Sequence, residues 1–187
     1  MIITITGPSG SGKSSLVRIL KRKYKIKGIV TATTRPKRKR EKDGIDYYFL
    51  TEEEFNITPM FESSVFGGNH YGTPKKDFFN AFSDDFDSVH VIVVDRNGAK
   101  LFGRMVNTFT VYISVDPEFA YANVARRSGK REAKLRQKLD VENGLYISDG
   151  YDCILSNTMD TTKEELAYEF MNFVESRKAI NKYNFNS

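Results

Sequence analysis

At residues 7–14 the chain reads Gly-Pro-Ser-Gly-Ser-Gly-Lys-Ser, directly after the run Ile-Ile-Thr-Ile-Thr at residues 2–6. It matches the pattern G-x-x-x-x-G-K-[ST], with a β-rich run before it and a helix predicted from Ser14 to about Tyr24. Glycines let consecutive backbone N–H groups turn toward phosphate oxygens, and the positive helix end points at the same anion. An ordinary glycine-rich turn is the alternative, and the complete match argues against it. We therefore interpret this stretch, the P-loop, as a nucleotide-phosphate site.

The bulk composition indicates one globular domain. The chain has 187 residues, of which 40% are hydrophobic and 28% charged, a balance typical of soluble proteins. No apolar run is long enough for a membrane span, and the first strand begins too early for a signal peptide. The single cysteine, Cys153, lies in an apolar run and is interpreted as a core thiol. We expect a cytoplasmic protein without disulfides or a metal framework.

Positive charge is gathered in two segments. Residues 35–42 and 126–138 hold thirteen of the 29 basic side chains, so the rest of the chain is net negative despite a total charge of +5. Two solvated loops or a nucleic-acid groove would also explain such segments. Because a P-loop is present, we favour small polyphosphate ligands and expect neither a nucleic acid nor a membrane as partner.

Strand-like and helix-like runs alternate along the chain, which predicts a parallel α/β sandwich with right-handed crossovers and helices on both faces. The run at 89–95 is almost continuously apolar, as expected of a strand buried on both faces. Other strands are expected at 28–32, 45–50, 61–66, 110–115 and 152–156, and other helices start at Thr51 and span 75–82, 118–139 with a break near Ser128-Gly129, and 163–180. Asp95, at the carboxyl end of the strand at 89–95, is expected beside the P-loop, whereas His90 is interpreted as a packing residue.

The combined motifs resemble the guanylate kinase family over nearly the whole chain. Its GMP-binding region reads T-T-R-x-x-R-x-G-E-x-x-G-x-D-Y-x-F, and this chain has Thr-Thr-Arg-Pro-Lys-Arg at 33–38, then Glu41, Gly44, Asp-Tyr at 46–47 and Phe49. A second element, Glu followed six residues later by G-N-x-Y-G-[TS], appears as Glu62 and Gly-Asn-His-Tyr-Gly-Thr at 68–73.

This resemblance implies transfer of a phosphoryl group from ATP to GMP or dGMP, with Mg²⁺, in a single domain. The implied parts are a core of residues 1–30, 75–125 and 139–187, a GMP-binding subdomain at 31–74 and a lid at 126–138. The implied ATP-binding residues are Gly7, Ser9, Gly10, Ser11, Gly12, Lys13, Ser14 and Ser15, with Lys13 on the β- and γ-phosphates and Ser14 on the metal. The implied GMP-binding residues are Thr31, Arg35, Arg38, Tyr47, Glu62, Tyr71, Thr73 and Asp95.

The chemistry of these side chains agrees with the resemblance. Arginine forks match phosphate oxygens bidentately, and tyrosine hydroxyls add neutral donors. Guanine presents N1–H and N2–H₂ as adjacent donors, so one carboxylate, that of Glu62, can accept both. Phosphoryl transfer itself needs positioning and charge neutralisation, for which the lid would supply arginines. We assign Arg127 and Arg136, together with Lys13, as the catalytic residues.

The chain departs from the family pattern at several positions. The lid is a few residues shorter, and Arg40, Ser63, Val93 and Asn97 replace residues that the family usually has. Two other functions therefore stay open: a guanylate-kinase-like protein-interaction module without catalysis, and a kinase for another phosphomonoester. The intact Lys13 and Ser14 argue against the first, and Glu62 and Thr73, which would address a purine edge, argue against the second. The sequence does not indicate the oligomeric state.

Overall fold

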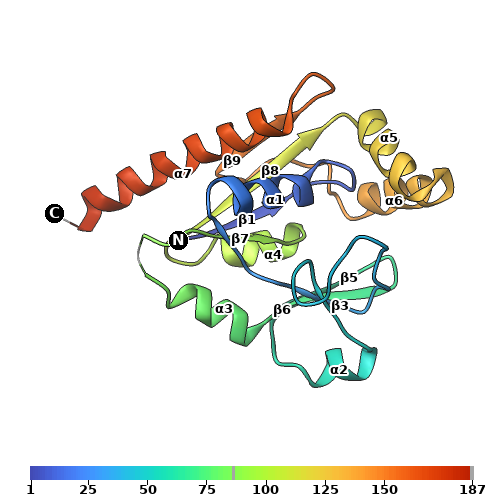
Figure 1. Cartoon of the computed structure of the whole chain (residues 1–187), viewed down its shortest axis with the longest axis horizontal. Coiled ribbons are helices and arrows are strands. Elements are labelled where there is room, and N and C mark those ends of the chain that lie inside the picture. The colour runs from blue at the N-terminus through green and yellow to red at the C-terminus, as the bar shows by residue number, and fades with distance from the viewer. Residues whose placement is uncertain (86, 186–187) are drawn as a thin grey trace.

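A parallel sheet forms the centre of the fold, as the sequence predicts. The computed structural model describes residues 1–85 and 87–185. Its main sheet has the strand order β2-β7-β1-β8-β9, and every neighbouring pair in it is parallel. These strands are β1 (Ile2–Thr6), β2 (Lys27–Gly28), β7 (His90–Val93), β8 (Thr108–Val115) and β9 (Cys153–Asn157). Since all carboxyl ends lie at one edge, the loop after β1 and the residues after β7 meet there (Figure 1).

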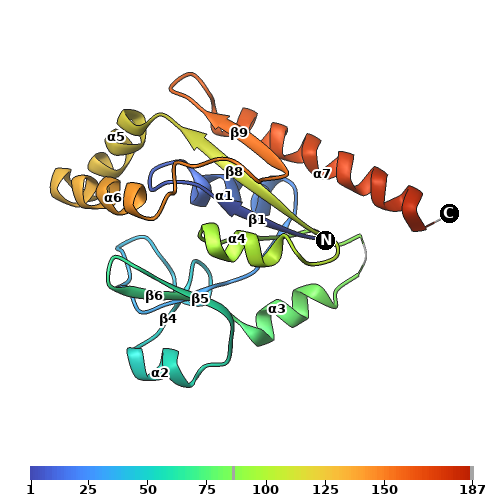
Figure 2. The ribbon, with the colours of Figure 1, turned by 180° about the vertical axis from the view of Figure 1, so that it is seen from behind.

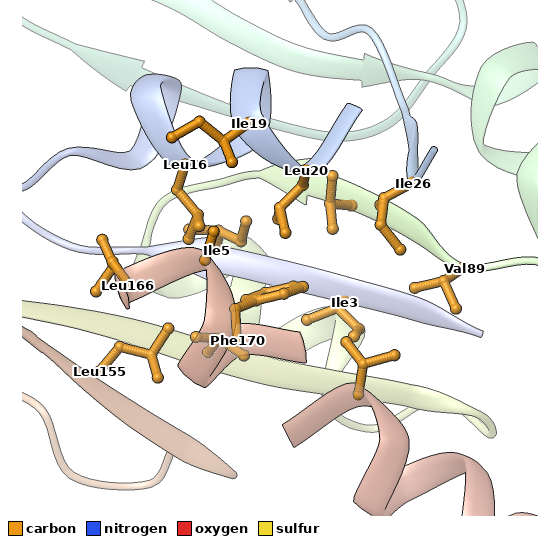
Figure 3. Close-up of a cluster of buried hydrophobic side chains, with 14 of the residues drawn as sticks. Ile3, Ile5, Leu16, Ile19, Leu20, Ile26, Val89, Leu155, Leu166 and Phe170 are labelled. Carbon is orange, nitrogen blue, oxygen red and sulfur yellow. The ribbon is translucent and has the colours of Figure 1, made fainter. Parts of the chain in front are cut away.

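Helices cover both faces of this sheet because β1 alternates its side chains between them. Ile3 and Ile5 point toward α1 (Lys13–Lys23) and α7 (Lys163–Phe185), where they join Leu16 and Phe170 in one buried cluster (Figure 3). Ile2 points to the other face, in the cluster formed with α3 (Lys75–Phe82) and α4 (Arg96–Phe102). Each such fully buried side chain contributes about 1.5–3 kcal/mol relative to an exposed one. The two clusters therefore fix the frame on which the P-loop rests.

A second, smaller sheet lies beside the main one (Figure 2). Its strand order is β4-β3-β6-β5, and its longest contact is the antiparallel β5–β6 hairpin. The strands are β3 (Ala32–Thr33), β4 (Tyr48–Phe49), β5 (Met60–Phe66) and β6 (Asn69–Pro74). The capping box predicted at Thr51 and Glu54 is confirmed at the start of α2 (Glu52–Ile57), where each side chain bonds the other's backbone N–H.

Two predicted strands are wrong in extent. The strand expected at 28–32 is divided, because Lys27–Gly28 pairs with β7 in the main sheet and Ala32–Thr33 pairs in the small sheet. The strand expected at 45–50 is reduced to Tyr48–Phe49. In both cases the local apolar pattern is continuous, while the partner strands decide where pairing begins and ends.

The segment 118–139 forms two helices, α5 (Pro117–Ser128) and α6 (Lys130–Glu142), which confirms the predicted break. Gly129 between them has a φ of +87°, a value that glycine adopts without strain. The helix α4 was not predicted. Cys153 is half-buried on the edge strand β9 and packs against the main core. Within the described residues, no helix combines the length and hydropathy that a membrane span requires.

Candidate nucleotide site

The P-loop joins β1 to α1 in a conformation that its glycines allow. Gly7, Gly10 and Gly12 have φ values of +147°, +86° and +98°, which side-chain-bearing residues rarely adopt. A Cβ on Gly10 would also collide with the backbone carbonyl oxygen of Ala120 on α5. The glycines thus bring the loop close to α5 and leave its backbone N–H groups free of side-chain obstruction.

Lys13 begins α1 and lies under the loop. Its Nζ donates to the carbonyl oxygens of Gly7 at 2.6 Å and Pro8 at 2.7 Å. The pKa of Lys13 is lowered to about 8, because burial lowers it and the nearby charges of Arg127 and Arg136 add to this effect, while Asp140 opposes it. A desolvated ammonium group in this position attracts a polyphosphate strongly, because little water screens it.

The remaining predicted loop residues lie around this ammonium group. Ser11 is fully buried, and its carbonyl oxygen accepts a 2.8 Å hydrogen bond from Asn157 Nδ2 at the end of β9. Ser14 is exposed on the first turn of α1, and the Ser15 N–H bonds the Gly12 carbonyl oxygen at 2.9 Å. Ser9 contacts Asp140, whose Oδ2 accepts from the Ser9 N–H at 2.8 Å.

Sequence reasoning missed Asn157 and Asp140. Asn157 ends a strand at the carboxyl edge of the sheet, where ligand sites gather, and that position was a usable signal. Asp140 lies among charged residues of a helix that reads as solvent-exposed, and no local pattern distinguishes it.

In the loop between β3 and β4, the carboxylate of Glu41 holds two arginines. Arg35, only 7% exposed, donates from Nη2 to Glu41 Oε1 at 2.9 Å, and Arg38 donates from Nη1 to the same oxygen at 3.3 Å. The Arg38 N–H also donates to Glu41 Oε2 at 2.9 Å. Burial alone would raise the pKa of Glu41, yet these hydrogen bonds hold it below its usual range. The two guanidinium groups are therefore held together before any phosphate arrives.

Tyr47 and Tyr71 lie next to these arginines. The Arg35 guanidinium lies 5.5 Å from the centre of the Tyr47 ring, and the two tyrosine rings meet edge to face at 6.3 Å. Burial, and then the neighbouring Tyr71, raises the pKa of Tyr47, so its hydroxyl stays protonated and able to donate. Four of the predicted phosphate-binding residues are thus gathered in one place.

Glu62 on β5 faces Thr73 on β6. Its Oε1 accepts a 2.6 Å hydrogen bond from the Thr73 hydroxyl. Burial raises the pKa of Glu62, the bond from Thr73 opposes the shift, and the charge of Asp95 adds to it. Asp95 itself caps α4, since its Oδ1 accepts from the Gly98 N–H at 2.8 Å. Glu62 and Asp95 therefore belong to one acidic corner between the two sheets.

Thr31 is the remaining predicted GMP-binding residue. It is buried directly before β3, and its carbonyl oxygen accepts from the Tyr48 N–H at 2.9 Å.

The lid, residues 126–138, lies on α5 and α6, and its arginines come within electrostatic reach of Lys13 and of Arg38. Desolvation, and then the charges of Arg38 and Arg136, lowers the pKa of Arg127. Arg136 donates to Glu132 Oε1 at 2.8 Å, and its guanidinium lies 5.4 Å from the centre of the Phe66 ring on β5. Burial alone would lower the pKa of Arg136, but the hydrogen bond to Glu132 and the nearby Tyr71 raise it above its ordinary value. The structure thus brings lid arginines and small-sheet arginines within electrostatic reach of each other.

Three of the residues that depart from the family pattern are exposed, namely Arg40, Ser63 and Asn97, whereas Val93 is partly buried against the main core. These substitutions leave the P-loop and the Glu62–Thr73 pair intact. The arrangement provides a phosphate-binding loop and a second cationic cluster, that of Arg35 and Arg38, with lid arginines close enough to affect the pKa of groups in both. Such a pair of subsites can bind two phosphorylated molecules with their phosphates facing each other.

Comparison with known proteins confirms the resemblance to guanylate kinases. The sequence model described as guanylate kinase matches residues 1–172. A guanylate kinase of Thermosynechococcus vestitus is 44% identical over 176 residues, which cover 90% of this chain and 91% of that protein. One from Thermotoga maritima is 35% identical over 166 residues, covering 83% and 78%. The crystal structure of guanylate kinase from Anaplasma phagocytophilum superposes with a TM-score of 0.65 at 26% identity, covering 95% and 85%. Because a family model spans most of its length and a relative is 44% identical over most of both chains, the chain belongs to the guanylate kinase family.

Proposed function

We propose that this protein transfers the γ-phosphoryl group of ATP to GMP or dGMP. The observation that carries the proposal is the Glu62–Thr73 pair on the β5–β6 hairpin of the small sheet, whose strand β3 leads into the loop that holds Arg35 and Arg38. A protein-interaction module would not need a buried lysine in its P-loop. A kinase for a phosphomonoester without a purine would not need a half-buried carboxylate at this position.

The P-loop and Lys13 would hold the β- and γ-phosphates of ATP. Ser14 would hold Mg²⁺ together with phosphate oxygens, since its hydroxyl is exposed on the first turn of α1. Among the described residues no three metal-ligating side chains cluster, and one hydroxyl suits an ion that keeps most of its ligands as water and phosphate. When bound, the metal supplies charge neutralisation on the phosphates.

Residues 31–74 would bind both the phosphate and the base of GMP. Arg35, Arg38, Tyr47 and Tyr71 would surround its phosphate, and Glu62 would accept the N1–H and N2–H of guanine. The Thr73 hydroxyl donates to one carboxylate oxygen at 2.6 Å, which fixes the orientation of the carboxylate. Thr31 and Asp95 would complete this subsite, with Asp95 orienting the acceptor or the waters of the metal.

Transfer would proceed by in-line attack of a GMP phosphate oxygen on the γ-phosphorus of ATP. The lid, residues 126–138, would bring Arg127 and Arg136 to the charge that develops on the transferring group. We propose residues 31–74 as the GMP-binding subdomain and residues 1–30, 75–125 and 139–187 as the core that carries ATP.

A coupled assay that measures ADP release tests the proposal directly. Purified protein is given ATP, Mg²⁺ and, in separate reactions, GMP, dGMP, AMP, CMP and UMP. We expect turnover with GMP or dGMP that far exceeds turnover with the other acceptors. Absence of transfer to every guanine acceptor would contradict the proposal and favour the interaction module.

A further inference from the structure

The lid is bordered on each side by a hydrogen bond to the P-loop. On α5, Asn123 Nδ2 donates to the carbonyl oxygen of Gly10 at 3.1 Å. On α6, the Asp140 carboxylate accepts from Ser9 twice, from the N–H at 2.8 Å and from the hydroxyl at 3.1 Å. These residues lie three positions before and two positions after the segment 126–138. The P-loop therefore contacts both helices just where the lid begins and ends.

Each of these contacts lies one helical turn from a lid arginine. Arg127 follows Asn123 by four residues on α5, and Arg136 precedes Asp140 by four residues on α6. Residues four apart share a helix face, so the face held against the P-loop is the face that carries the arginine. Both arginines and Asp140 are close enough to Lys13 to affect its pKa. The hydrogen bonds thus connect the arginines to the loop that would hold the phosphates.

Asp140 is unusual for a residue in such a charged helix because its side chain is only 1% exposed. Burial raises the pKa of its carboxyl group, while the Ser9 hydrogen bonds and the charges of Lys13 and Arg136 oppose that shift. No ion pair within 4 Å joins Asp140 to another described side chain. Burying a carboxylate is costly unless hydrogen bonds compensate it, and for Asp140 the P-loop residue Ser9 supplies them. Its presence between loop and lid therefore points to a role in geometry.

We propose that Asp140 is a positioning residue for phosphoryl transfer, which holds Ser9 of the P-loop to the base of α6 and so sets where Arg136 stands over the phosphates. The inference rests on the proposed function, because it assigns Asp140 to the same reaction. Asp140 lies on the donor side, remote in the chain from the residues proposed to hold GMP. Its effect is expected in the rate of transfer more than in acceptor binding.

The substitution Asp140→Asn tests this role with almost no change in volume. It removes the charge and one of the two acceptor oxygens, so α6 is held less firmly to Ser9. We expect kcat to fall on the order of 10- to 10²-fold, the effect of a misplacement of about 1 Å at a reacting centre. The KM for GMP should stay within about threefold, because ground-state binding of the acceptor is unaffected. Glu142→Gln, on the same helix with an exposed carboxylate, is the matched control.

Amide hydrogen exchange gives a measurement that does not depend on activity. In the free protein, amides of residues 126–138 should exchange faster in Asp140→Asn than in the unmodified protein or Glu142→Gln. Exchange in β1 and β8 should stay the same, since these strands lie in the main core. Uniformly faster exchange everywhere would show a purely structural role for Asp140 and overturn the proposal.

Ser9→Ala provides a second route if Asp140→Asn does not fold. It removes the hydroxyl bond and leaves the backbone bond, so a smaller fall in kcat and faster lid exchange are expected; no change in either would overturn the proposal. In an active unmodified protein, a kcat for Asp140→Asn within twofold of Glu142→Gln would also overturn it. If the unmodified protein transfers no phosphate, the proposed function fails instead, and the exchange experiment still decides whether Asp140 holds the lid.

Discussion

Glu62→Gln is the substitution that most directly tests how this protein would choose its base. The Glu62 carboxylate already accepts one hydrogen bond at 2.6 Å from Thr73, and its Oε2 lies 3.3 Å from the position that a Cβ on Gly98 would take. The group is therefore confined between β6 and α4 and cannot turn freely. In the proposed complex it accepts two N–H groups of guanine. Glutamine keeps one acceptor and presents an NH₂ group where the base presents a donor.

The size of the effect follows from these contacts. A hydrogen bond to a charged partner contributes about 1.5–3 kcal/mol, and a buried donor left without a partner is costly. The variant loses one hydrogen bond to a charged group and places the glutamine NH₂ against an N–H donor of guanine. Together these changes should cost about 2–4 kcal/mol, or roughly 30- to 10³-fold in kcat/KM for GMP. Because burial raises the pKa of Glu62, the comparison belongs at about pH 8, well above the ordinary carboxyl range, where the carboxylate is ionised.

AMP serves as the internal reference in this assay. Adenine presents an unprotonated N1 and no amino group at C2, so the unmodified protein should favour GMP over AMP by on the order of 10³-fold or more. Glu62→Gln should lower kcat/KM for GMP and dGMP, and so reduce the preference for GMP over AMP. Glu53→Gln, an exposed carboxylate on α2, is the control for general effects on the small sheet. Comparable kcat/KM for AMP and GMP in the unmodified protein would refute the reasoning, and so would a loss smaller than about threefold in Glu62→Gln.

Three further substitutions examine the other parts of the structure. Lys13→Ala should leave the fold intact by circular dichroism but lower kcat about 10²-fold or more, since it removes a preorganised charge; undiminished turnover would exclude the assigned donor site. Phe66→Leu removes the ring that lies 5.4 Å from the Arg136 guanidinium, so kcat should fall severalfold; an unchanged kcat would show that this contact does not position the lid arginine. Hydrogen bonds from Lys27, from the Asp85 N–H and from the His90 ring hold the pKa of Asp84 below its ordinary value, so this group stabilises the fold above about pH 4 and loses that effect as pH falls. Asp84→Asn should therefore lower the melting temperature at pH 7. Its melting temperature should also fall less between pH 7 and pH 3 than that of the unmodified protein, and identical melting temperatures for the two proteins at both pH values would contradict this.

The sequence was sufficient for features whose physical cause is local. The P-loop needs glycines at positive φ, a lysine and a helix start within eight residues, and all of these stand next to one another in the chain. The capping box of α2 and the break at Gly129 are equally local. The main parallel sheet could be predicted because strands buried on both faces have an apolar run as their signature.

Features that depend on distant partners could not be predicted in the same way. Nothing in residues 28–32 indicates that the chain leaves one sheet and enters another, because the apolar pattern continues across the change. The helix α4 was missed because Asn97-Gly98 suggests a turn. In the structure, a Cβ on Gly98 would lie 3.0 Å from Val94 and 3.3 Å from the Glu62 carboxylate. The glycine is explained by close packing against Glu62, which only the fold reveals.

The same reasoning explains why the lid was the least predictable part of the site. The basic residues of 126–138 were visible in the sequence, but contacts with distant parts of the chain position their helices: Arg136 lies against Phe66, and the hydrogen bond between Ser9 and Asp140 spans 131 positions. A helical pattern treats Asp140 as one more charged surface residue, whereas the fold buries it. An arginine in a lid acquires a defined position only through such contacts. We therefore expect the rate of phosphoryl transfer to depend on Asp140 as well as on the arginines that the sequence makes conspicuous.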